Sequence, residues 1–384
     1  MGGHERSGFQ GQKWGCNVRS LATLFAVSLA VTTALDAACF RTDPGSQREG
    51  LAASTTQTNR ARYEAWRVYA SINSGSPSHP RWRDWGTKCQ AFQLHCPARN
   101  PAEKLVEALN PPVQLELAGT ADVNSPAGSM AEVLYNEVAL SNIRNNHLGI
   151  PQVLRTALHN GRASIPPFAA GSIIIKTMWY PITFGDLNPT LLLWFPTSTG
   201  PQTITIDRSE MVCAQSSVAK PSVSCFGNIP VDDALAAASA ALVRQGVSFY
   251  TLRKGDVLML KGMHIMFKSP DLGWVFATFW WDRAAAANQS DRPALPSGPW
   301  GNYVMAATVD PYTTIYNPNL EGLMGNGKGR NSNCLSCHQR AVVPQKPGEC
   351  CWLKKGPAPA SDSSRRLKTD YVWSVADNAA GSSR

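Results

Sequence analysis

The feature that most constrains the fold is a series of short runs rich in β-branched and aromatic residues in the second half of the chain. Each run is bounded by glycine, proline or aspartate, residue types that interrupt strands and favour turns. The runs cover residues 171–182, 191–196, 202–206, 247–252, 256–269 and 274–281. This pattern predicts a largely antiparallel β-sheet.

Helical patterns lie before and between these runs. Residues 59–72 place aromatic and aliphatic side chains on one helical face, and residues 129–148 form the longest amphipathic pattern, with Gly149 after it. Shorter helices are expected over 101–109 and 231–246. The expected fold class is α+β, with a helical amino-terminal part packed on the sheet.

The composition is that of a globular protein, with 43% hydrophobic and 16% charged residues and no internal repeat. We expect one domain over residues 59–343. Residues 39–58 are polar and are expected to form a linker. Residues 344–384 are rich in proline, serine and basic side chains, which predicts a flexible tail.

The amino terminus has the pattern of a secretory signal. Three basic residues precede an uncharged apolar stretch over residues 21–35, and small residues follow it. A signal peptide over residues 1–38 predicts a periplasmic or secreted protein without a stable membrane span after cleavage. An uncleaved anchor is one alternative, and lipidation of Cys39 is another, which the nearby Asp36 disfavours.

Cleavage removes three basic and two acidic residues, so the formal net charge changes only from +9 to +8. Export also suits a chain with ten cysteines, because disulfides persist in oxidising compartments. Two pairs are close enough in sequence to close short loops: Cys89 with Cys96, and Cys213 with Cys225.

The motif that carries chemistry is Asn333-Cys-Leu-Ser-Cys-His-Gln339 near the carboxyl end. Cys334 and Cys337 lie one helical turn apart, a spacing that suits two thioether bonds to the vinyl groups of haem. His338 would then be the proximal iron ligand. The sequence therefore predicts one covalent haem c on a carboxyl-terminal attachment segment.

Two other interpretations apply to the same pair of cysteines. A thioredoxin-like dithiol also has this spacing, but it follows a strand at the start of a helix, whereas this motif follows a glycine-rich loop. A zinc site would need further ligands; Cys350 and Cys351 are candidates, although adjacent cysteines suit tetrahedral coordination poorly.

The sixth iron position must be open, filled from another chain or filled from upstream, because residues 339–384 contain neither methionine nor histidine. On a strand, His264 and Met266 share one face, so either could approach the iron. We expect His264 to be the ligand and Met266 the alternative, with Met178 and Met324 less favoured. The competing interpretation is that His264 and Met266 only pack in the sheet.

The chain resembles a group of poorly characterised exported c-type cytochromes from proteobacteria. The similar segments are YEAWRVYA, RWRDW, GSIIIKTMWYPI, GMHIMFK, WVFATFWW and NSNCLSCHQRAV, within residues 60–343. The resemblance implies an exported haem protein, with haem-binding residues at Cys334, Cys337 and His338. It implies no particular reaction.

Electron transfer by a single haem is the function that the sequence favours, with a redox partner that could be acidic because the tail is basic. The alternative is a haem enzyme or sensor with an exchangeable sixth position, acting on peroxide or a small gas. A third class is a structural protein whose haem has no function. We identify no catalytic residue and expect no nucleic-acid partner.

Overall fold

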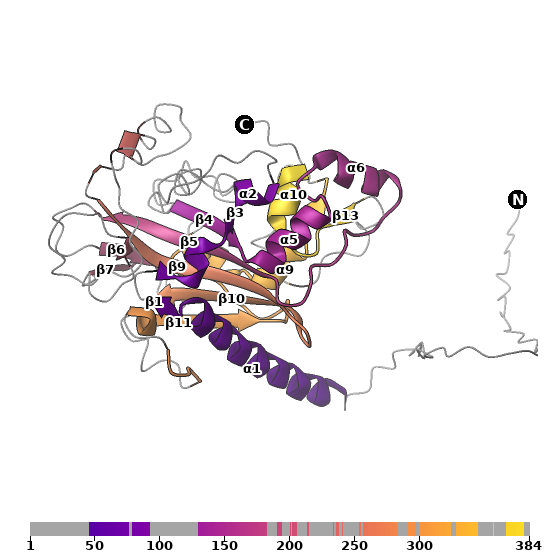
Figure 1. Ribbon diagram of the computed structural model, residues 1–384. Coiled ribbons are helices and arrows are strands. Elements are labelled where there is room, and N and C mark those ends of the chain that lie inside the picture. Colours follow the sequence, from indigo (N-terminus) through magenta and orange to yellow (C-terminus); the bar gives the residue numbers. More distant parts are fainter. Residues whose placement is uncertain are drawn as a thin grey trace, which may run out of the picture. The chain divides into compact units, whose positions relative to one another are not determined.

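The structure is a computed structural model, and Figure 1 shows its arrangement. It describes residues 46–76, 79–92, 130–182, 190–193, 200, 202–205, 213–214, 233, 236–237, 240, 253–254, 256–282, 291–295, 299–323, 328–344, 356 and 366–379. The chain divides into two compact units, 1–46 and 47–384. The expected signal peptide over 1–38 lies outside the described residues.

Within the described residues, seven strands form one antiparallel sheet, which confirms the α+β fold class. Six of them lie in the order β11-β10-β9-β5-β4-β3, and β8 pairs with β9. Their bounds are β3 (Gly86–Thr87), β4 (Met130–Tyr135), β5 (Ile173–Ile182), β8 (Cys213–Ala214), β9 (Val257–Ser269), β10 (Gly273–Trp281) and β11 (Tyr303–Thr308).

The three strands at the centre of the sheet were all expected from sequence. β9 pairs with β5 on one side and with β10 on the other, where a tight turn with Gly273 at φ +68° joins the two strands. β11 was missed, and the expected strand at 247–252 lies outside the described residues. Two other expected strands pair with each other in a separate sheet, β6 (Thr190–Leu193) and β7 (Gln202–Thr205).

Helix α1 (Ser46–Ile72) covers one face of the sheet with aromatic side chains. Tyr69 stacks on Phe279 of β10 with ring centroids 4.1 Å apart, and Trp66 meets the same ring edge-on at 5.4 Å. Burial of these large rings provides hydrophobic stabilisation for this layer. The expected linker over 39–58 is wrong from Ser46 onward, because those residues belong to α1.

The other face of the sheet packs against helices α5 (Glu137–Asn145), α6 (Pro151–His159), α9 (Cys334–His338) and α10 (Trp373–Ala379). The expected flexible tail is wrong over 366–379. Val372, Val375, Ala376 and Ala379 are spaced as one helical face and are buried in this layer. Before them, β13 (Leu367–Lys368) pairs with β12 (Val342–Val343), so this part of the tail belongs to the core.

The helix expected over residues 129–148 is also wrong in its first part. Residues 130–135 form strand β4, which pairs with β3 and β5. The helix begins only after Asn136, whose side chain accepts a hydrogen bond from the backbone N–H of Ala139 at 3.0 Å. An N-cap of this kind marks the helix start, and alternation of side chains across the sheet takes precedence over helical periodicity before it.

Shorter elements complete the description. They are β1 (Gly75–Ser76), β2 (His79–Pro80), η1 (Arg81–Asp84), α2 (Lys88–Phe92), η3 (Pro299–Asn302), η4 (Glu321–Leu323) and η5 (Lys328–Asn331). The expected helix at 101–109 lies outside the described residues, and Asp233, Ala236, Ala237 and Ala240 of the expected helix at 231–246 are helical. None of the helices in the described part of the chain is long and apolar enough to cross a membrane.

A β-bulge in β9 places Lys261 inside the protein. Met178 pairs with Gly262 and Trp179 pairs with Leu260, so Lys261 is the extra residue between them. Its backbone carbonyl accepts a hydrogen bond from the Asn319 side chain at 3.0 Å. Burial lowers the pKa of the Lys261 ammonium to about 7.

This depressed pKa predicts a pH-dependent cost of burying Lys261. Between pH 7 and the ordinary lysine pKa, the unfolded chain holds the proton and the folded chain does not, so stability rises with pH there. Replacing Lys261 with methionine should therefore stabilise the protein most near pH 7 and progressively less toward pH 10. Urea unfolding across this range measures the difference. The exposed Lys254→Met variant should show no such trend, and a pH-independent effect of Lys261→Met would contradict the prediction.

Candidate functional site

The cysteine–histidine motif forms the short helix α9, and Asn333 determines where the helix begins. Asn333 has an extended backbone, and its side-chain oxygen accepts a hydrogen bond from the Ser336 N–H at 2.7 Å. Its amide nitrogen donates to the carbonyls of Asp310, at 2.9 Å, and Thr313. The cap therefore joins the start of α9 to the segment that follows β11.

The two cysteines of the motif are partly buried and are not disulfide-bonded. They lie one helical turn apart on α9, the spacing that thioether attachment requires. Burial, with the nearby Glu321 carboxylate and Cys337, raises the pKa of the Cys334 thiol. By contrast, Cys89 is disulfide-bonded, although the expected partner Cys96 lies outside the described residues, so that pairing stays a prediction.

His338 is partly buried and is held through one ring nitrogen. Its Nδ1 lies 2.7 Å from the backbone carbonyl oxygen of Tyr371, and its ring packs on Phe276 of β10 with centroids 4.8 Å apart. Because a carbonyl can only accept, Nδ1 carries the proton and Nε2 keeps its lone pair. Burial is the main cause that lowers the pKa of His338 to about 4, so the imidazole is neutral at pH 7, the form that binds metals.

The Tyr371 carbonyl is presented by an unusual backbone. Asp370 and Tyr371 have φ values of 45° and 70°, in the left-handed region that non-glycine residues rarely adopt. Asp370 is fixed there by its carboxylate, which pairs with Lys268 at 3.1 Å and accepts from the Phe168 N–H at 2.8 Å. Such strain often accompanies functional sites, and here it aims a carbonyl at the motif histidine.

The sheet face beneath the motif is ordered in cross-strand rows. Met266 pairs with Ile174 on β5 and with Phe276 on β10, so this row is apolar. The next row is polar, since His264 pairs there with Lys176 and Thr278. Met266 and Phe276 share a core cluster with Leu335 of α9. His264 and Met266 thus lie on the sheet face that carries the motif.

His264 is in contact with a partly buried carboxylate. Its Nε2 lies 3.1 Å from Oε1 of Glu321. Burial acts to raise the pKa of Glu321, but attraction to His264 and the hydrogen bonds to the carboxylate outweigh it and hold that pKa at about 2. Burial is also the main cause that lowers the pKa of Lys176, which the Glu321 charge partly offsets. The charges of His264, Glu321 and Lys176 all influence the pKa of His338, which places these residues near the motif.

A rigid turn positions Glu321. Its Oε2 accepts from the Asn317 N–H at 2.9 Å, and the Asn317 side chain donates to Thr278 at 2.8 Å and to the Phe279 carbonyl at 3.1 Å. Gly262 permits this close approach, because a Cβ there would lie 2.9 Å from Nδ2 of Asn317. The backbone turn is therefore anchored directly on the sheet.

The residues expected as candidates for the sixth iron ligand lie in different surroundings. Nε2 of His264 is occupied by Glu321, whereas Met266 is buried among apolar side chains. Met178 is buried and Met324 lies outside the described residues. Glu321, Lys176 and Tyr371 were missed from sequence. One signal for Lys176 was a lone charge within a β-branched run, but nothing local distinguished Glu321 or Tyr371.

The donor set fits haem c. Two unbonded thiols lie one turn apart, and the adjacent neutral imidazole has its Nδ1 on a backbone carbonyl, the second contact that orients metal-binding histidines. Among the described residues, no group of three or more histidine, cysteine or acidic side chains could hold a bare metal ion. Cys334, Cys337 and His338 would hold the haem, which would supply one-electron chemistry at its iron.

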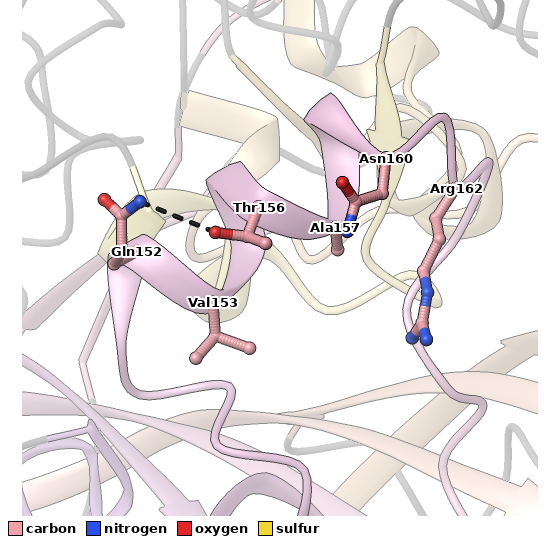
Figure 2. Close-up of a pocket in the computed structure, with 6 residues that line it drawn as sticks. All are labelled: Gln152, Val153, Thr156, Ala157, Asn160 and Arg162. Atoms are coloured by element: carbon pink, nitrogen blue, oxygen red, sulfur yellow. Dashed lines mark hydrogen bonds between the residues drawn. The ribbon is translucent and has the colours of Figure 1, made fainter.

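A surface hollow lies along α6 and is lined by Gln152, Val153, Thr156, Ala157, Asn160 and Arg162 (Figure 2). Gln152 and Thr156 are hydrogen-bonded to each other at 3.5 Å. Arg162 is its one charged side chain, and none of its residues belongs to the motif. The hollow is thus separate from the candidate site.

Comparison with known proteins gives no match. No family model, curated protein or solved structure is matched by the chain. The resemblance to exported c-type cytochromes therefore rests on the residues that carry it.

The cap of α9 gives a test of how the motif is held. Replacing Asn333 with alanine removes the acceptor for the Ser336 N–H and should lower the free energy of unfolding by about 1 kcal/mol or more. Asn333→Asp keeps the acceptor but places a carboxylate oxygen against the Asp310 and Thr313 carbonyls, so it should lose stability as well. Chemical denaturation of the two variants measures this, and an Asn333→Ala protein as stable as the parent would contradict a capping role.

Proposed function

We propose that this protein is an exported monohaem c-type cytochrome, with haem bonded to Cys334 and Cys337 and His338 as proximal ligand. The observation that carries the proposal is the 2.7 Å contact between Nδ1 of His338 and the Tyr371 carbonyl. It fixes the tautomer that leaves Nε2 available to iron. A histidine that served only in packing would not need a strained turn to orient it.

Electron transfer is the leading activity of this proposal. Haem held by Cys334, Cys337 and His338 would supply one-electron chemistry, and the closely packed core beside the motif would keep these residues in place as the charge changes. The proposed site of action is the periplasm or the outside of the cell. The formal charge of +8 after signal cleavage favours an acidic redox partner, which complementary charge would steer to the protein.

Ligand chemistry at the iron is the second candidate, and one contact favours it. Nε2 of His264 lies 3.1 Å from the Glu321 carboxylate, so the expected sixth ligand is engaged elsewhere. An iron with an exchangeable position binds small gases or peroxide, whereas two strong protein ligands favour electron transfer.

Covalent haem is tested by expression with the cytochrome c maturation machinery. The protein should be coloured, should keep its haem on a denaturing gel, and should show the mass of one added haem. Cys334→Ala combined with Cys337→Ala should lose covalent haem, because both thioether bonds are removed.

Single substitutions provide matched controls. Cys334→Ala and Cys337→Ala should each retain at most one thioether bond, which shifts the reduced absorption band relative to the parent protein. Cys89→Ala changes a cysteine outside the motif and should leave that band in place. A colourless, metal-free parent protein from the same cells would refute the proposal.

Export is tested separately from haem attachment. Signal cleavage should remove roughly the first 34 to 38 residues, because the apolar stretch ends at Leu35 among small residues. Amino-terminal sequencing and the intact mass of exported protein measure the cleavage site. Mature protein that retains Met1 would contradict export by cleavage.

A further inference from the structure

The contact between His264 and Glu321 is not explained by packing alone. The Glu321 side chain is charged and only 18% exposed, and an ionised carboxylate is costly to bury without compensation. The Asn317 N–H satisfies one carboxylate oxygen, and His264 faces the other. Nε2 of His264 is itself fully buried and has no hydrogen-bond partner in the described part of the chain, so the Glu321 carboxylate at 3.1 Å is its polar neighbour through charge rather than through hydrogen-bond geometry. The two groups therefore depend on each other.

The choice of ring nitrogen determines what His264 can do. Nε2 projects from the far edge of the imidazole and can reach the iron of a porphyrin. Nδ1 is next to the carbon that bears the side chain, so the Cβ methylene would press on the porphyrin plane. When Nε2 faces Glu321, the nitrogen suited to haem ligation is occupied.

The carboxylate is in turn difficult to displace. Glu321 is the first residue of η4, and the Asn317 turn before it is hydrogen-bonded to Thr278, Phe279 and, through Asn319, to Lys261. Asn317 and Asn319 are both completely buried. Glu321 is thus held by hydrogen bonds that do not depend on His264.

We propose that Glu321 is a positioning residue that keeps Nε2 of His264 from serving as the sixth iron ligand. The inference rests on the proposed haem attachment and deepens the second candidate function. The sixth position then remains open to a small uncharged diatomic ligand. The apolar row of Ile174, Met266 and Phe276 beside His264 suits such a ligand, because it presents no charge to the site.

The experiment compares the haem-loaded parent protein with Glu321→Leu, His264→Ala and the double variant. Carbon monoxide is the probe for the reduced form, and the absorption spectrum reports the iron spin state. The parent protein and His264→Ala should both bind carbon monoxide readily and lack a bis-histidine low-spin spectrum. Glu321→Leu should become low-spin as His264 ligates iron. Its carbon monoxide affinity should fall about tenfold or more, since an internal ligand then occupies the position most of the time.

The double variant should restore the open position, which assigns the new ligand to His264. Glu321→Gln, which keeps an acceptor for the Asn317 N–H, should give an intermediate result and serves if Glu321→Leu fails to fold. Asp291→Asn removes a carboxylate paired with Arg62 at 2.8 Å and should leave the spectrum unchanged.

Three results would overturn the proposal. In the first, the parent protein binds carbon monoxide only after His264 is replaced. In the second, the spectrum of Glu321→Leu is identical to that of the parent. In the third, the double variant is low-spin. Each requires haem to be attached, so none can be confused with failure of the proposed function. Absence of covalent haem in the parent protein would refute the haem proposal itself.

Discussion

The antiparallel pairing of β9 with both β5 and β10 is the constraint on which the rest of the structure depends. Side chains alternate across a strand, so the register of these pairs decides which residues meet on each face. One face receives the aromatic surface of α1, and the other receives the motif helix. A shift of one residue in β9 would move His264 and Met266 to the α1 face and dismantle both layers.

Much of the sheet could be predicted because its strands carry strong local signals. The runs that became β5, β9 and β10 are long, β-branched and bounded by turn residues. The helix predicted over residues 130–135 was wrong because the apolar spacing there suits a helix as well as a strand. Only pairing with the neighbouring strands β3 and β5 selects the strand. Helix α10 was not predicted, because it lies among residues of tail-like composition, although Val375 and Ala376 form its buried face.

The candidate site could be proposed from sequence only where its residues are close together in the chain. Cys334, Cys337 and His338 lie within five residues, and the haem prediction follows from their spacing. Glu321 and Tyr371 contribute through contacts made by folding, one with a strand far away in sequence and one through a backbone carbonyl that no sequence pattern reveals. Lys261 was likewise invisible, because its burial depends on a bulge rather than on its neighbours in sequence.

The histidine of the motif and its carbonyl partner are 33 residues apart, and the partner comes later in the chain. During synthesis Cys334 and Cys337 are therefore made before Tyr371, whose carbonyl orients the imidazole of His338. Folding of residues 366–379 onto the sheet, through Leu367 and Val372, is the event that completes the candidate site. A chain that stopped before this segment would still carry the whole motif, yet its histidine would lack a fixed tautomer. Orientation of the motif histidine thus depends on the folding of residues 366–379, which follow it in the chain.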